Sequence, residues 1–183
     1  STAEYFVDLD FSAVGSLLDI PKVKLRNENA FEAFNYYRSS AWKIRGVDVP
    51  LQALHNSGNN NLFAYRYDWD DHRRYVIADF KKLIGSAHAT EIPLLTGNTK
   101  LVGGYPLSDL IYPPSLSKRY TSKNMMKLWT NFAKNGYPGK TSNSVVWEPY
   151  SFDENHVNFL VIDKRKNMKM KKECMKEQKT GSM

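Results

Sequence analysis

The stretch LFAYRYD at residues 62–68 decides the fold class of this chain. It is rich in aromatic residues, it begins with a nearly continuous apolar run, and it follows the turn-forming cluster SGNNN at residues 57–61. Such a run predicts a strand that is buried on both faces, as the strands of parallel sheets are. Because helical patterns precede and follow it, we expect an α/β architecture.

Helices are predicted on both sides of this strand. Residues 27–43 repeat apolar and aromatic side chains at helical spacing, and Gly46 is expected to stop that helix. A shorter helix is expected at residues 49–56. The clearest helix is predicted at residues 123–134, where apolar side chains form one continuous stripe.

The ends and the role of this last helix are also predicted. Ser122 is expected to be its N-cap, and Gly136 is expected to supply the left-handed residue that ends it. Packing in the core is the favoured role of the stripe, and a homodimer interface is the alternative. Short strands are expected at residues 145–147 and 157–162.

The net charge of +7 is concentrated at the C-terminal end. Residues 164–183 hold eight Lys or Arg residues and two Glu residues, so they carry +6 of that charge. We therefore expect a folded portion at residues 1–163 and a basic, disordered tail at residues 164–183. The tail has no aromatic residue on which bases could stack, and the rest of the chain is nearly neutral, so nucleic-acid binding is not expected. The alternative to a disordered tail is a tail that makes an electrostatic contact.

Composition also bears on whether the chain could span a membrane or bind a metal. No apolar run approaches the length of a membrane-spanning helix, so no membrane span is expected. Cys174 is the only cysteine, which excludes an intramolecular disulfide and a zinc site built on cysteines. No metal or organic cofactor is implied.

One histidine, His88, has the sequence surroundings of a functional residue. It lies in GSAHATEIP, residues 85–93, where small side chains let a loop bring an imidazole close to a substrate. The ordinary pKa of histidine suits proton transfer near neutral pH. The residues alone leave two interpretations open, a general base and a histidine hydrogen-bonded inside its loop. His55, His72 and His156 are expected at the surface.

Several segments resemble one known family. The run GSAHATEIP, following AYRYDWD at residues 64–70, resembles the catalytic-histidine region of the type-B carboxylesterases. The likeness covers roughly residues 30–165 in the order of the family. Its further segments are YRSSAWK at 37–43, KLWTNFAK at 127–134, WEPY at 147–150 and FLVI at 159–162.

The resemblance implies an α/β-hydrolase fold, of which this chain would be the C-terminal part, and a Ser-His-Glu/Asp triad. His88 matches the general base of that triad. Glu91 matches a family glutamate that lies in a buried network supporting the site, and an ordinary carboxylate at a helix start is the alternative. One departure is Ala89, which stands where the family usually has glycine, so its methyl group is expected to meet an unusual backbone angle or to narrow the pocket.

The nucleophile of such a triad is missing from this sequence. No Gly-x-Ser-x-Gly motif is present, and Asp8 and Asp10 lie too close to His88 along the chain to match the triad acid. The resemblance thus implies a C-terminal fragment of a serine carboxylic-ester hydrolase, acting on a small-molecule ester together with an N-terminal remainder. Alone, the chain is expected to fold poorly and to be inactive. The alternative is a non-catalytic truncated or interaction protein on the same scaffold.

Overall fold

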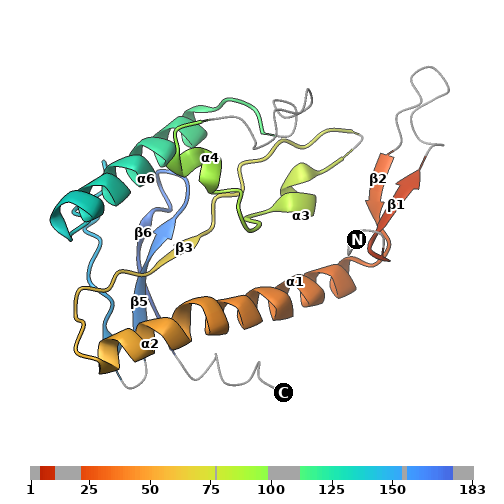
Figure 1. The fold of residues 1–183 in the computed structure, drawn as a ribbon. Helices are drawn as coiled ribbons and strands as arrows, with labels where there is room; N and C mark the ends of the chain where they lie inside the picture. Colours follow the sequence, from red (N-terminus) through yellow and green to blue (C-terminus); the bar gives the residue numbers. More distant parts are fainter. Residues whose placement is uncertain (1–4, 11–21, 77, 99–111, 154–155, 175–183) are drawn as a thin grey trace.

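The computed structural model describes residues 5–10, 22–76, 78–98, 112–153 and 156–174. Figure 1 shows α4 and α6 on one side of a small sheet and α1 and α2 on the other, so the predicted α/β class is confirmed. In chain order the elements are β1 (Val7–Asp10), β2 (Lys22–Leu25), α1 (Glu28–Lys43), η2 (Ile44–Asp48), α2 (Val49–Asn56), β3 (Tyr65–Tyr67), α3 (Phe80–Ile84), α4 (Ile92–Leu95), α6 (Leu116–Asn135), β4 (Phe152–Asp153), β5 (His156–Ile162) and β6 (Lys169–Cys174).

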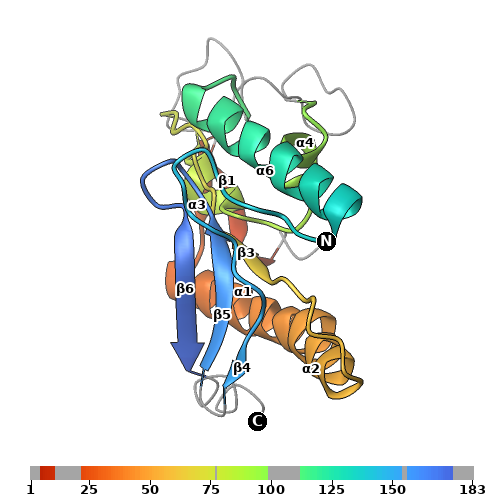
Figure 2. The same ribbon diagram turned by 90° about the vertical axis from the view of Figure 1, so that its left-hand side faces the viewer.

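Strand β5 is the centre of the sheet. It pairs in parallel with β3, with Tyr65 opposite Leu160, and antiparallel with β6 along nearly its whole length. The short strand β4 pairs with the beginning of β5. Figure 2 shows β5 between β6 and the pair of β3 and β4. The hairpin of β1 and β2 forms a separate sheet at the start of α1.

The strand that is buried on both faces is β5, and the prediction that residues 62–68 form such a strand is wrong. Residues Val157 to Ile162 are all buried, whereas only Tyr65–Tyr67 of the earlier stretch are in strand conformation and Tyr65 is exposed. The reason is position: in the part of the chain that the structure describes, β3 pairs with β5 alone and its other edge has no strand beside it.

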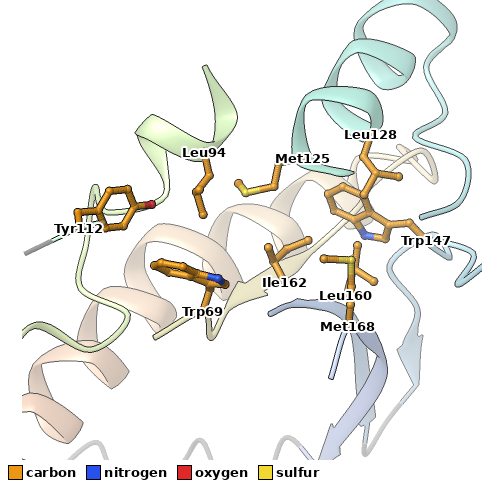
Figure 3. Packing of buried hydrophobic residues seen from close by; sticks show 9 residues of the cluster. All are labelled: Trp69, Leu94, Tyr112, Met125, Leu128, Trp147, Leu160, Ile162 and Met168. Atoms are coloured by element: carbon orange, nitrogen blue, oxygen red, sulfur yellow. The ribbon is translucent and has the colours of Figure 1, made fainter. Parts of the chain in front are cut away.

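Alternate side chains of β5 build two apolar clusters. Leu160 and Ile162 join the larger cluster beneath α6, which Figure 3 shows in detail. Phe159 and Val161 point to the opposite face, where Leu51 of α2 packs against them. The full membership of the larger cluster is Trp69, Leu94, Tyr112, Met125, Leu128, Trp147, Leu160, Ile162 and Met168.

The segment that was predicted to be a disordered tail contains strand β6. The prediction of a disordered segment from residue 164 is wrong for residues 164–174, because Lys169–Cys174 pair with β5. Met168 is buried and Met170 packs against the larger cluster, while the lysines between and after them are exposed. Charge counting missed this alternation of methionine with lysine. Residues 175–183 lie outside the described residues.

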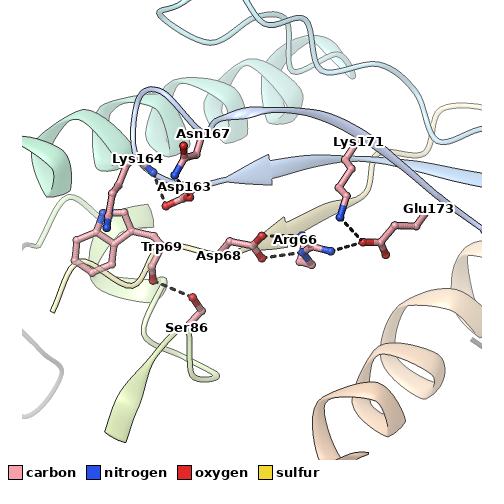
Figure 4. A network of polar contacts seen from close by, with 9 residues as sticks. All are labelled: Arg66, Asp68, Trp69, Ser86, Asp163, Lys164, Asn167, Lys171 and Glu173. Atoms are coloured by element: carbon pink, nitrogen blue, oxygen red, sulfur yellow. Dashed lines mark hydrogen bonds and ion pairs between the residues drawn. The ribbon is translucent and has the colours of Figure 1, made fainter. Parts of the chain in front are cut away.

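An ionic contact joins the two edges of the sheet across β5. The guanidinium of Arg66 on β3 donates to both carboxylate oxygens of Asp68 at 2.8 Å and lies 5.0 Å from the ring centre of Phe159. It then reaches Glu173 on β6, which also accepts from Lys171 at 3.1 Å (Figure 4). This contact explains why a glutamate among lysines favours order in β6.

Acid should weaken the fold at this contact. Burial raises the pKa of Glu173, but Lys171 and Arg66 together outweigh it and hold the pKa below its ordinary value. A carboxyl whose folded pKa is lowered adds stability above its unfolded pKa, and that stability is lost as the pH falls through the folded value. We expect Glu173→Gln to flatten the loss of unfolding free energy between about pH 5 and pH 3, measured by urea denaturation. The exposed Glu148→Gln is the control, and equal flattening in both variants would contradict the account.

The long helices start and stop differently from the prediction in two places. Asn27 caps α1, accepting from the backbone N–H of Ala30 at 3.0 Å, but Gly46 does not end the helical path. Instead η2 carries the chain through a π-helical turn from α1 into α2. Lys43 and Asp48 form an ion pair at 3.1 Å across this turn.

Helix α6 begins seven residues before the predicted start, and its N-cap is Ser115 rather than Ser122. Ser115 accepts from Lys118 N–H at 3.0 Å, while Ser122 is buried inside the helix and donates to the carbonyl of Leu94 on α4 at 2.7 Å. Gly136 ends the helix with a φ of 68°, as predicted. The predicted strand at 145–147 is reduced to one bridge, between Lys140 and Val146.

Candidate active-site histidine

The loop that carries His88 follows β3 in the chain and connects α3 to α4. His88 itself is exposed, and its imidazole contacts the indole of Trp42 on α1 edge-on, with ring centres 4.7 Å apart. Among the described residues, no serine or carboxylate hydrogen-bonds to this imidazole.

Hydrogen bonds hold the beginning of the loop to the chain that leaves β3. His72 Nε2 lies 2.8 Å from the carbonyl oxygen of Gly85. The hydroxyl of Ser86 donates to the carbonyl oxygen of Trp69 at 3.1 Å, as Figure 4 shows. Both contacts come from Trp69 and His72, in the segment that follows β3, so this segment fixes where the loop starts.

The end of the loop is fixed by Thr90, which is buried. Its hydroxyl donates to the carbonyl of Ala87 at 2.6 Å, closing the turn around His88. Its carbonyl accepts from the hydroxyls of Tyr67 and Tyr112 at 3.5 and 3.4 Å. The loop is thus pinned at both ends while the imidazole stays outside.

Ala89 has the backbone angle that the sequence leads one to expect. Its φ is 71°, in the left-handed region that glycine adopts without cost. The strain of this alanine is local to the turn and does not remove the imidazole beside it.

Replacing Ala89 by glycine should relieve that strain. A left-handed conformation costs an L-residue about 1–2 kcal/mol, of which the added freedom of glycine in the unfolded chain returns about 0.4–1 kcal/mol. We expect Ala89→Gly to raise the unfolding free energy by about 0.5–1 kcal/mol, measured as a shift of the urea midpoint. Ala87→Gly, two residues earlier and without a positive φ, should lower it instead. A loss in both variants would contradict the assignment.

Glu91 lies directly behind this turn, among tyrosines. Burial is the largest cause that raises the pKa of Tyr67 and Tyr112, and partial burial does the same for Tyr65, which is still 38% exposed; the negative charge of Glu91 raises the pKa of each further. Glu91 precedes α4, but its side chain makes no capping hydrogen bond there. Both interpretations of Glu91, a carboxylate in a supporting network and a carboxylate at a helix start, stay predictions.

The other three histidines lie outside the loop that carries His88. His72 is 7% exposed and packs against Trp69 and Tyr112, so the prediction that it lies at the surface is wrong. His55 is half-buried on α2, and His156 is exposed at the start of β5, as predicted. The charged residues next to His72 in the sequence hid its burial, because they point outward while the imidazole turns toward the core.

Sequence reasoning also missed Lys118, which is fully buried in the first turn of α6. Its ammonium donates to the carbonyl of Tyr112 at 2.7 Å and lies 3.6 Å from the centre of that ring. A cation over an aromatic face gains about 2 kcal/mol when it is desolvated. No pattern in the sequence distinguishes this lysine from the exposed lysines of the same helix.

The described part of the chain has neither a cluster of metal-binding side chains nor a membrane-spanning helix. In residues 5–10, 22–76, 78–98, 112–153 and 156–174, no three His, Cys, Asp or Glu side chains gather as metal ligands would. Within the same ranges, no helix combines the length and the apolar character that a membrane crossing requires.

The fold and the loop together define an α/β protein that presents one histidine on a hydrogen-bonded turn beyond a sheet strand. The model of the carboxylesterase family matches residues 33–180, and the chain belongs to that family. The resemblance read from the segments around His88 is therefore confirmed at the level of the family.

Individual relatives match over part of their length. The chain is 32% identical to the bile salt-activated lipase of Bos taurus over 119 residues, which cover 62% of this chain and 17% of the lipase. Two solved structures of a PNB esterase are similar at 23% and 20% identity, with TM-scores of 0.41 and 0.42. They cover 65% and 66% of this chain and 20% and 21% of their own. The chain thus spans between 17% and 21% of these relatives.

Proposed function

We propose that this chain supplies the catalytic histidine, His88, of a serine carboxylic-ester hydrolase whose serine and triad acid lie outside it. The observation that carries the proposal is the exposed imidazole on a turn whose two ends are hydrogen-bonded to the chain around β3. General-base catalysis needs a nitrogen that is held in place and still open to the reacting hydroxyl.

The chemistry assigned to His88 is proton transfer in two directions. A serine hydroxyl attacks the ester carbonyl and gives its proton to the imidazole, and the imidazolium then protonates the departing alcohol. Water repeats the sequence on the acyl-serine, releasing the acid and restoring the neutral histidine. Glu91 is assigned to the network behind the turn, where its charge lies near the tyrosine hydroxyls.

The remainder of the hydrolase has surfaces on this chain to which it would bind. The outer edge of β3 has no strand beside it in the described part of the chain, and unpaired strand edges are templates for pairing. An apolar hollow of about 130 Å³ lies next to that edge. Its lining is Phe63, Tyr65, Trp129, Phe132, Pro138 and Trp147.

The exposed side of the long helical segment forms the second such surface. Tyr36 and Tyr37 on α1, and Val49 on α2, are each more than half exposed. Exposed aromatic and aliphatic side chains of this kind can pack against a partner surface. We assign both surfaces to contact with the N-terminal remainder, which would also bring the serine toward His88.

The experiment compares this chain with the complete protein, meaning the source protein that contains residues 1–183. A Western blot against a peptide from β6 measures its subunit mass, and hydrolysis of a short-chain nitrophenyl ester measures its activity. We expect a mass near three times 21.1 kDa, esterase activity in the complete protein, and none in residues 1–183 alone. A 21.1 kDa native protein with no bound partner would contradict the proposal.

One observation favours a second candidate, a non-catalytic interaction protein. The sequence has no Gly-x-Ser-x-Gly motif, so these residues by themselves contain no nucleophile of the expected kind. A native 21.1 kDa chain that captures another protein without hydrolysing esters would favour this candidate. A 21.1 kDa chain that co-purifies with a larger, serine-bearing chain would favour a two-piece enzyme.

A further inference from the structure

A buried histidine that the ester-hydrolysis mechanism does not use lies directly beneath the His88 loop. His72 is 7% exposed, and its ring packs at 5.4 Å from the ring of Trp69 and 5.7 Å from that of Tyr112. These two aromatic residues belong to the larger apolar cluster (Figure 3). A polar ring in such a place needs a hydrogen bond to offset the loss of water.

The hydrogen bond of His72 goes to the backbone of the loop. Nε2 lies 2.8 Å from the carbonyl oxygen of Gly85, and a carbonyl can only accept, so Nε2 carries the hydrogen. Gly85 has φ of 53° and ψ of −141°, a conformation that side-chain-bearing residues rarely adopt. That conformation directs its carbonyl to the imidazole, which places the hydrogen bond at the first residue of the loop.

At its beginning, the loop is held by hydrogen bonds rather than by packing, while the bonds of Thr90 hold its other end. Gly85, Ser86, Ala87 and Ala89 offer no large side chain for packing, and Ser86 and Ala87 are exposed. Its location therefore depends on hydrogen bonds, and the bond from His72 is the shorter of the two that tie its start to the chain after β3. His88 follows Gly85 by three residues, so a shift at Gly85 moves the imidazole.

We infer that His72 is a positioning residue for His88, which fixes the loop through the Gly85 carbonyl. The inference rests on the proposed function, because it concerns where the general base stands relative to the serine. A displacement of about 1 Å in a catalytic group costs roughly 100-fold in rate. His72 itself touches neither substrate nor serine.

The test uses the complete protein and three variants. His72→Phe keeps an aromatic ring but cannot donate, and His72→Gln restores an N–H near the position of Nε2. His156→Phe makes the same replacement at an exposed histidine and serves as the matched control. Active sites are counted with a fluorophosphonate that reacts with the serine, so that kcat refers to folded enzyme only.

We expect His72→Phe to lower kcat per active site by about 10- to 100-fold with KM within twofold of wild type. His72→Gln should recover most of that loss, and His156→Phe should match wild type. An unchanged kcat in His72→Phe, or a glutamine variant as slow as the phenylalanine variant, would overturn the inference.

Two further measurements separate the outcomes. His88→Ala measured alongside tests the proposed function itself: if it retains activity, the proposed function fails, and if it alone is inactive, only the role of His72 fails. Where His72→Phe yields no folded protein, NMR of the ¹⁵N-labelled wild type decides. Nε2 of His72 should be the protonated nitrogen in that spectrum, and an Nε2 without hydrogen would overturn the inference.

Discussion

Replacing His88 by alanine in the complete protein should lower kcat/KM for a short-chain nitrophenyl ester by roughly 10⁴-fold or more. Without the imidazole, no group takes the proton of the serine hydroxyl or returns it to the alcohol. The loop should keep its structure, because among the described residues the exposed imidazole makes no hydrogen bond within its own loop. Steady-state kinetics would measure kcat/KM, and a thermal unfolding curve of the same sample would show whether the variant keeps its fold.

The control for this prediction is His156→Ala, an exposed histidine at the beginning of β5. It should change neither the rate nor the unfolding temperature appreciably. A His88→Ala enzyme that keeps more than about a tenth of its activity would mean that another group is the base. The proposed role of His88 as the general base would then fail.

Trp69→Ala should produce the largest loss of stability, about 3–5 kcal/mol. The indole is 1% exposed in the larger apolar cluster, with its ring 5.4 Å from that of Tyr112, and its Nε1 donates to Ser117 at 3.0 Å. Alanine would remove that packing, leave a cavity under the His88 loop, and leave the Ser117 hydroxyl without its donor. Urea denaturation followed by far-UV circular dichroism measures the loss.

The matched control makes the same deletion at Trp42, which is 54% exposed. Trp42→Ala should cost about 1 kcal/mol or less, since a half-exposed side chain leaves no closed cavity. Equal losses at the two tryptophans would mean that the cluster around Trp69 does not carry the stability assigned to it. A loss of activity in Trp42→Ala without a loss of stability would point instead to its ring contact with His88.

The fold was predictable where one element decides its own structure. The body of helix α1 follows from its helical spacing of apolar residues, and the left-handed end of α6 follows from Gly136, because such patterns act within a few residues. The assignment of the most buried strand failed, because burial depends on which elements lie on either side. Residues 62–68 look as apolar as β5, yet among the described residues β5 has strands on both sides and β3 has a strand on one side.

The predicted tail failed for a related reason. Charge counting treats residues 164–183 as uniform, but Met168 and Met170 alternate with exposed lysines, and Arg66 on the far side of β5 binds Glu173. The partner of a strand that is distant in the sequence cannot be read from the strand itself. No pattern in residues 164–183 predicts that this segment pairs with β5.

At the candidate site, the sequence located the loop but not what holds it. The resemblance singled out His88 and Glu91, and the alanine after His88 correctly indicated an unusual backbone angle. The burial of His72 and its bond to Gly85 join residues thirteen positions apart, and no local pattern encodes such a contact. Tertiary hydrogen bonds of this kind become visible only in the structure.

The central claim is that His88 activates a serine that lies outside these 183 residues, and one labelling measurement tests it most directly. The complete protein and its His88→Ala variant would be treated with a fluorescent fluorophosphonate, and the labelled peptide would be identified by mass spectrometry. We expect one labelled serine, outside residues 1–183, and labelling at least 100-fold slower in the variant. A label on a serine within this chain, or equal labelling of both proteins, would contradict the account.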